Sequence, residues 1–124
     1  LTYSCAGHPA PIVVRLGEAK VLKPNHGKAS PALGLIPQAV YSSNTVSLDE
    51  VDRLLMYTDG LHEVEDSSGE ELGIEHVITS MEQSSEKGLE ECLDSLLDES
   101  RRHAVDGEFA DDVCLFGLEV GSGL

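Results

Sequence analysis

The sequence predicts an α+β fold in which helices pack on one face of a sheet. Residues 1–58 contain short apolar runs separated by turn residues, residues 59–110 have helical periodicity, and residues 113–120 return to a strand pattern. A strand that follows helices usually returns to the middle or the edge of an existing sheet. We therefore expect the last strand to join the sheet that the first strands form.

Five short strands are expected in the first half of the chain, because turn-forming residues bound each apolar run. They are Leu1–Cys5, Pro11–Leu16, Ala19–Leu22, Val40–Leu48 and Arg53–Thr58. The second and third form a hairpin around Gly17–Glu18. The fifth contains the continuous apolar run Leu54–Tyr57, which predicts burial on both faces. Between the strands, Lys23–Lys28 is expected to be a polar turn and Pro31–Gly34 a compact loop.

Two helices are expected after residue 59, since apolar residues recur there at intervals of three and four positions. The first contains Ile74, Val77, Ile78 and Met81, and the second contains Leu89, Cys92, Leu93, Leu96 and Leu97. Ser84 or Ser85 is expected to cap the second helix, and Asp106–Gly107 to close it.

The length and the charge of the chain limit its functions. A chain of 124 residues argues for one domain at most, and an apolar fraction of 40% is too high for a disordered acidic tail. Eight basic against 23 acidic residues give a net charge of −15. This charge disfavours nucleic acid and anionic membrane surfaces as partners, because both would be repelled. It favours divalent cations and basic partner surfaces.

The expected location is the cytoplasm. No apolar run approaches the ~20 residues that a membrane span needs, and we expect no membrane association. The chain opens without the basic and apolar stretches of a secretory leader. Its three cysteines are odd in number and widely spaced, which does not fit a disulfide framework.

Aspartate residues stand at the ends of two expected strands. Asp59 directly follows the buried strand and precedes Gly60, and Asp111–Asp112 stands just before the final strand. Carboxylates held by rigid strands are ligands that Mg²⁺ and Mn²⁺ prefer, and a glycine lets backbone approach closely. The same residues also fit an ordinary Asp-Gly turn and an ordinary strand cap. The pattern leaves both interpretations open.

Other polar groups give weaker signals. Cys5 and His8 have the spacing of a metal-ligand pair, but no second pair matches them, which argues against zinc. The acidic stretch from His62 to Glu71 is expected to be solvated surface. The stretch from Lys23 to Lys28 is a small basic patch without aromatic residues, in a very acidic chain.

Five segments, taken in order, resemble one family of enzymes. They are Ala6–Pro11, Ala32–Gly34, Asp52–Glu63, Gly69–Gly73 and Asp111–Val113. Together they resemble the C-terminal part of the bacterial metal-dependent protein phosphatases. These belong to the protein phosphatase 2C superfamily, in the stage II sporulation protein E-like branch that regulates sigma factors. The specific part is the sequence Tyr-Thr-Asp-Gly-Leu at Tyr57–Leu61 with a later Asp-Asp pair before a strand.

The resemblance implies a β-sandwich flanked by helices, incomplete here because the N-terminal part of the domain is missing. Residues 1–120 would be the C-terminal portion of a single phosphatase-like domain and residues 121–124 a tail. It implies that Asp59 and Asp111 are catalytic ligands of a centre of two Mn²⁺ or Mg²⁺ ions, with Gly60 in the cofactor-binding turn. In such a centre a metal-activated water attacks phosphoserine or phosphothreonine. The implied partner is a phosphorylated signalling protein of the anti-sigma-factor antagonist type.

The chain departs from the family pattern in three places. Val51 stands where the family usually has Gly, and Cys114 stands where it usually has Thr. The early Gly-Gly-Asp segment, whose aspartate bridges both metals in the family, does not occur in this chain. Two aspartates cannot hold two divalent cations, so we expect little or no turnover from these 124 residues alone.

Two further expectations follow from these departures. The first is an alternative function, namely a non-catalytic phosphatase-like module that binds a partner. The second concerns assembly. Missing strands would leave a sheet edge and a core face uncovered, so we expect homodimerisation or strand exchange through this open face and its exposed sheet edge.

Overall fold

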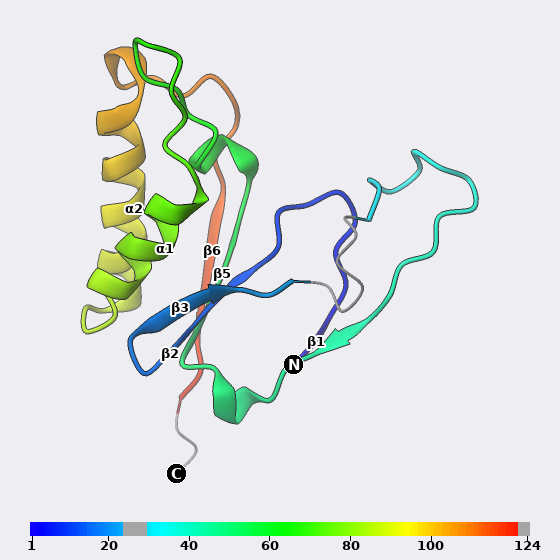
Figure 1. Cartoon of the computed structure of the whole chain (residues 1–124). Coiled ribbons are helices and arrows are strands. Elements are labelled where there is room, and N and C mark those ends of the chain that lie inside the picture. The colour runs from blue at the N-terminus through cyan, green and yellow to red at the C-terminus, as the bar shows by residue number, and fades with distance from the viewer. Residues whose placement is uncertain (24–29, 122–124) are drawn as a thin grey trace.

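The computed structural model describes residues 1–23 and 30–121 (Figure 1). Within these ranges two antiparallel sheets and two α-helices form. The strands are β1 (Thr2–Tyr3), β2 (Ile12–Arg15), β3 (Glu18–Val21), β4 (Asn44–Thr45), β5 (Arg53–Tyr57) and β6 (Leu115–Glu119), and the helices are α1 (Ile74–Gln83) and α2 (Leu89–His103). The α+β class expected from the sequence is confirmed.

The larger sheet has four strands in the order β3-β2-β5-β6, and β1 pairs with β4 in a second, two-stranded sheet. The expected hairpin is confirmed. It turns through Leu16 and Gly17, whose φ angles are both positive, as a two-residue turn between twisted strands requires. The last strand, β6, joins the larger sheet at its edge beside β5, as expected for a strand that follows helices.

The two faces of the larger sheet carry two separate hydrophobic cores. On one face the sheet packs against both helices. This core contains Ile12, Val14, Leu55, Tyr57, Leu61, Val77, Met81, Cys92 and Leu96. On the opposite face, Val13 and Leu54 are buried against the segments that flank β1 and β4, among them Leu1 and Val46. Strand β5 is therefore buried on both faces over Leu54–Leu55, but Met56 is exposed, which is a departure from the expected continuous burial.

Several expected boundaries are wrong. The strand expected over 40–48 shrinks to Asn44–Thr45, and Val40 at its expected start is 88% exposed rather than buried in the core. The strand expected over 1–5 shrinks to Thr2–Tyr3. The cap of α2 is Gly88, without a side-chain hydrogen bond, whereas Ser84 ends α1 and donates its hydroxyl to the Ser80 carbonyl at 2.6 Å.

Some expected segments fall partly outside the described residues, and one expected helix end differs. In the polar turn and basic patch expected at Lys23–Lys28, residues 24–28 lie outside the described residues, as do 122–124 of the expected tail. Helix α2 ends at His103, and Asp106–Gly107 follows it in a short 3₁₀ turn. Among the described helices, none combines the length and the apolar composition that crossing a membrane would require.

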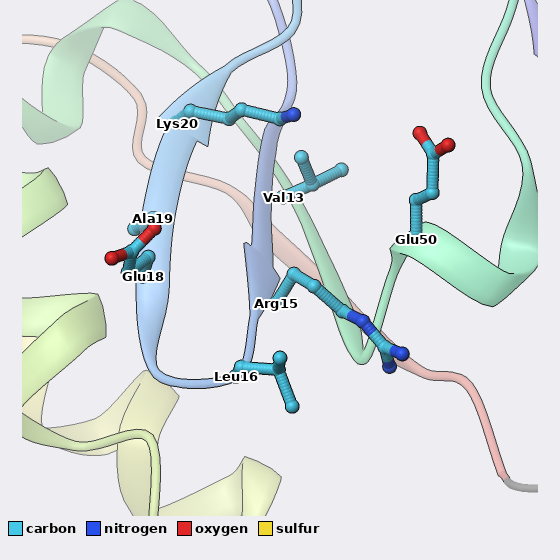
Figure 2. Close-up of a pocket in the computed structure, with 7 residues that line it drawn as sticks. All are labelled: Val13, Arg15, Leu16, Glu18, Ala19, Lys20 and Glu50. Carbon is cyan, nitrogen blue, oxygen red and sulfur yellow. The ribbon is translucent and has the colours of Figure 1, made fainter.

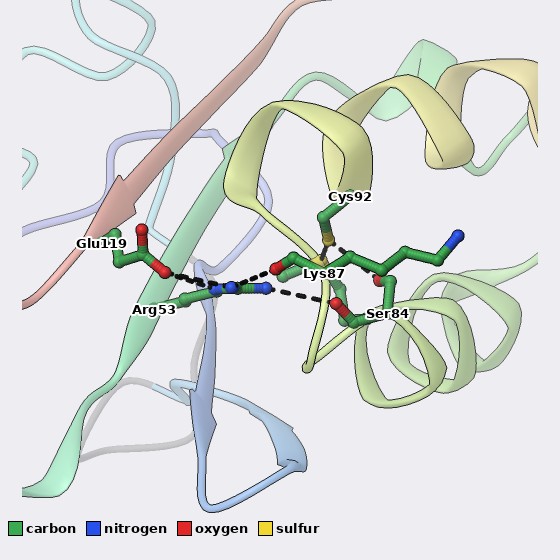
Figure 3. A network of polar contacts seen from close by, with 6 residues as sticks. Arg53, Ser84, Lys87, Cys92 and Glu119 are labelled. Atoms are coloured by element: carbon green, nitrogen blue, oxygen red, sulfur yellow. Dashed lines mark hydrogen bonds and ion pairs between the residues drawn. The ribbon is translucent and has the colours of Figure 1, made fainter.

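Arg53 links the larger sheet to the connection between the helices (Figure 3). Arg53 is almost fully buried, at 7% exposure. Its Nε and Nη2 atoms donate to Glu119 Oε1 at 3.1 and 3.0 Å, Nη1 donates to the Ser84 carbonyl at 3.2 Å, and Nη2 also donates to the Lys87 carbonyl. One side chain of β5 thus satisfies an acceptor on β6 and two carbonyls between α1 and α2.

We expect Arg53→Met to lower the free energy of unfolding by roughly 2–4 kcal/mol. The substitution leaves the Lys87 carbonyl and the Glu119 carboxylate without the donors that Arg53 provides, and it removes one of the two donors to the Ser84 carbonyl, which also accepts from the Lys87 N–H. Urea denaturation followed by circular dichroism measures the change. The matched control is Arg15→Met, because Arg15 pairs with Asp52 at 2.5 Å on the exposed surface, where ion pairs contribute little. Equal losses in the two variants would contradict the structural role of Arg53.

Candidate metal site at the end of the central strands

Asp59 and Asp111 lie at the same end of the larger sheet. Strands β5 and β6 are antiparallel, and Tyr57 pairs with Leu115. The C-terminal end of β5 therefore lies beside the N-terminal end of β6. Asp59 begins the 3₁₀ turn Asp59–Leu61 just beyond β5, and Asp111 stands four positions before β6 begins. The structure brings the turns that carry the two sequence-predicted aspartates together.

Thr58 holds the two aspartate turns against each other. Its backbone N–H donates to the Cys114 carbonyl at 3.1 Å. Its hydroxyl donates to the Asp112 carbonyl at 2.9 Å and accepts from the Cys114 N–H at 2.9 Å. We call these three bonds the Thr58 clamp. The sequence gives no sign of this role, because the position of Thr58 after a strand does not reveal a partner more than 50 residues away.

Gly60 lets the two turns approach more closely than any other residue would. It is buried, and a Cβ atom placed on it would lie 2.7 Å from the Asp112 carbonyl oxygen and 3.3 Å from that of Asp111. The clash is with backbone, which cannot rotate away as a side chain can. A glycine is needed here for close approach, as the sequence suggested.

The two carboxylates are exposed, and each accepts one local hydrogen bond. Asp59 Oδ1 accepts from the Gly60 N–H at 3.0 Å, and Asp111 Oδ1 accepts from the Asp112 N–H at 2.7 Å. In the part of the chain that the structure describes, neither aspartate makes an ion pair. Among the described residues, the negative charge at this end of the sheet is therefore not balanced by a salt bridge.

These donors have the right chemistry for Mg²⁺ or Mn²⁺, but they are too few. Both ions take oxygen ligands in near-octahedral sites. Among residues 1–23 and 30–121, no group of three or more His, Cys, Asp or Glu side chains is placed to hold a metal ion. The described residues thus provide two neighbouring carboxylates and do not by themselves form a metal centre.

The segment Ala6–His8, part of the first segment of the family resemblance, is packed against the segment Ala32–Gly34. The Gly7 N–H donates to the Ser30 carbonyl at 2.9 Å, and Gly7 has a φ of 70° with Ala32 so close that a Cβ would lie 2.7 Å from its Cα. Two segments that carry the family resemblance therefore meet in space.

A cavity of about 310 Å³ lies between this packed segment and the clamp. Cys5 and His8 line it from one side, and Thr58 and Cys114 line it from the other. His8 Nδ1 lies 3.1 Å from the Pro9 carbonyl, so this side chain is occupied by a local contact.

An aromatic pair lies behind the Asp59 turn. The rings of Tyr57 and His62 meet edge to face with their centroids 5.6 Å apart. Burial raises the pKa of Tyr57 to about 12, so its hydroxyl stays neutral at physiological pH. His62 Nδ1 is buried and has no hydrogen-bond partner within the described residues. The Tyr57 ring therefore packs against His62 directly beside the Asp59 turn.

The remaining charged segments lie away from the aspartate turns or are used in local structure. A cavity of about 390 Å³ runs along the β2–β3 hairpin (Figure 2), at the opposite end of β5 from Asp59. Arg15, Lys20, Glu18 and Glu50 give it charges of both signs. In the acidic stretch, hydrogen bonds from Ser68 and Glu70 lower the pKa of Asp66 to about 2, and the four glutamates are exposed, which confirms the expected solvated surface.

Comparison with known proteins agrees with the resemblance seen in the sequence. The sequence model of the family described as Stage II sporulation protein E (SpoIIE) matches residues 1–121. That family consists of phosphatases of the protein phosphatase 2C type, which are generally metal-dependent. No curated protein and no solved structure gives a match.

We expect Gly60→Ala to separate the aspartate turns and to lower the free energy of unfolding by roughly 1–3 kcal/mol, because its methyl group must displace the backbone of Asp111–Asp112. Urea denaturation measures the loss, and NMR chemical shifts of Asp112 and Cys114 report the displacement. Gly121→Ala is the control, since nothing lies within 4 Å of its Cβ position. An unchanged Asp112 environment in Gly60→Ala would contradict the close approach.

Proposed function

The chain belongs to the Stage II sporulation protein E family, and on that premise we propose that it carries part of the active site of a metal-dependent phosphoserine and phosphothreonine phosphatase. Asp59 and Asp111 are the proposed metal ligands, and Gly60 the glycine of the cofactor-binding turn. The proposed cofactors are two Mn²⁺ or Mg²⁺ ions. The proposed substrate is a phosphorylated bacterial signalling protein of the anti-sigma-factor antagonist type.

The observation that carries the proposal is the Thr58 clamp. It joins two turns more than 50 residues apart in the sequence and leaves one exposed aspartate on each. An ordinary Asp-Gly turn and an ordinary strand cap need no such connection. Hard oxygen donors held by strand ends are what Mg²⁺ and Mn²⁺ prefer.

The charge of the site supports the same proposal. A phosphoryl group is anionic and is repelled by two carboxylates that form no ion pair with any described side chain. Such a site can accept a phosphoprotein only with cations present, which agrees with a metal-dependent reaction.

The proposed site requires at least one more ligand than the described residues provide. We propose that another segment of the intact gene product supplies it, and that these 124 residues alone have little or no turnover. Manganese-stimulated hydrolysis of p-nitrophenyl phosphate by the isolated chain would contradict this part of the proposal.

The alternative function is a non-catalytic module that binds a partner. The incomplete ligand set favours it. Cys114 does not favour it, because the clamp uses only the backbone N–H and carbonyl of that residue. A cysteine therefore preserves the clamp as well as the threonine that the family usually has.

The deciding experiment measures Mn²⁺-dependent release of phosphate from a phosphoserine protein by the intact gene product. We expect Asp59→Asn and Asp111→Asn each to lower kcat/KM by more than about 100-fold, since even residues that only orient metal ligands cost 10- to 100-fold when replaced. Asp94→Asn, on the exposed side of α2, is the matched control and should keep full activity.

Two other outcomes of this assay would contradict the proposal. Activity that survives Asp59→Asn would overturn the assignment of that residue. If the wild-type protein binds a signalling partner but releases no phosphate with either Mn²⁺ or Mg²⁺, the phosphatase proposal is wrong and the non-catalytic partner-binding module is favoured.

A further inference from the structure

The short turn that carries Asp59 is held at both of its ends. Thr58, the residue before the turn, is fixed by the Thr58 clamp. Leu61 is the last residue of the turn, and its carbonyl accepts a hydrogen bond from the Ser100 hydroxyl of α2 at 3.0 Å. Asp59 and Gly60 lie between these two anchors, so the backbone that carries the Asp59 carboxylate depends on both.

The contact between Ser100 and Leu61 is shielded from water. Ser100 is 1% exposed, and Leu61 is not exposed at all. In the part of the chain that the structure describes, no backbone N–H donates to the Leu61 carbonyl. A buried carbonyl without a donor costs free energy, so the hydroxyl of Ser100 satisfies a group that would otherwise have no partner.

This contact differs from the usual hydrogen bond of a serine in a helix. Such serines often donate to the carbonyl four residues earlier, as Ser95 does to Glu91 at 2.8 Å. Ser100 also reaches the carbonyl of Leu96, at 3.1 Å, but its shorter contact crosses to Leu61, 39 residues earlier in the chain. Its single hydroxyl proton is therefore shared between a local acceptor and one in the Asp59 turn.

One rigid peptide unit connects Ser100 to Asp59. The Leu61 carbonyl and the His62 N–H belong to the same planar peptide group. The carbonyl of this group accepts from Ser100, and its N–H donates to the Asp59 carbonyl at 3.0 Å. The Leu61 side chain is packed in the core, but apolar packing is non-directional, whereas a hydrogen bond fixes the direction of the peptide group.

The last turn of α2 is a firm support for this contact. Cys92 and Leu96 anchor the helix in the core that it shares with the larger sheet. His103, three positions after Ser100 and therefore on the same side of the helix, donates from Nε2 to the Glu70 carbonyl at 2.8 Å. The end of α2 thus holds the segment that follows Asp59 at two separate points.

We propose that Ser100 is a positioning residue for Asp59. Its hydroxyl orients the Leu61–His62 peptide group, this group holds the Asp59 carbonyl, and the turn thereby presents the Asp59 carboxylate beside Asp111. That this orientation serves cation binding and phosphate release rests on the proposed function. That Ser100 holds the turn does not, so the two parts are tested by separate measurements.

Amide hydrogen exchange of the 124-residue chain, without metal, tests whether Ser100 holds the turn. The His62 and Glu63 N–H groups both donate to the Asp59 carbonyl, so their exchange reports opening of the turn. We expect Ser100→Ala to accelerate their exchange, relative to the amides of β5, by about tenfold, the factor that corresponds to one lost hydrogen bond.

Ser84→Ala is the matched control. It also removes a buried hydroxyl that donates to a carbonyl four residues earlier, and it should leave the exchange of the turn unchanged relative to β5. Ser100→Cys fills the same space with a weaker donor and should accelerate exchange in the same direction, which keeps the test open if the alanine variant does not fold. Unchanged relative exchange in the Ser100 variants would overturn the proposal, whether or not the protein is a phosphatase.

The Mn²⁺ concentration that gives half-maximal phosphate release by the intact gene product tests the second part. We expect Ser100→Ala to raise this concentration by about tenfold, at the lower end of the effect of residues that orient metal ligands, and Ser84→Ala to leave it unchanged. A loosened turn with an unchanged Mn²⁺ requirement would overturn the positioning of Asp59 for the reaction. A wild-type protein without phosphatase activity would instead overturn the proposed function, and the exchange measurement would still decide whether Ser100 holds the turn.

Discussion

The register in which β5 pairs with β6 sets the contacts at both ends of these two strands. At one end it sets Arg53 opposite Glu119, which lets a buried guanidinium also satisfy the carbonyls between the helices. At the other end it continues through Thr58 and brings the Asp59 turn against Asp111–Asp112. A slip of one residue would turn the buried side chains of β5 to the wrong face, so the hydrophobic core protects the geometry of the candidate site.

The two faces of the larger sheet differ in how completely they are packed. The face under α1 and α2 is packed against both helices, and residues 62–108, which include the helices and the loops beside them, carry 15 of the 23 acidic side chains. The opposite face is packed only near β1 and β4. Its open half ends at the Thr58 clamp, since Thr58 and Cys114 line the cavity on this face. What covers this half-face can therefore influence the aspartate turns.

The sequence predicts the elements whose signal is local. Strong periodicity locates both helices, the β2–β3 hairpin, β5 and β6, and the positions of Asp59 and Asp111 at strand ends follow from them. The sequence does not predict that Val40 is exposed, because burial depends on which segment covers it. The end of α1 at Ser84 and the role of Thr58 are also non-local. A serine at position 84 could cap either helix from the sequence alone. Thr58 can hold the aspartate turns together only in the folded chain, where Cys114 lies beside it.

Whether the two aspartate turns form one cation-binding site can be measured by NMR during a titration of the chain with Mn²⁺, whose paramagnetism broadens the signals of nearby amides. If the turns act together, the amides of Gly60 and Asp112 broaden in parallel and before those of any other residue, and Thr58→Val abolishes the common response. Broadening that begins in the acidic stretch 63–71, or at only one of the two turns, would show that Asp59 and Asp111 do not share a cation.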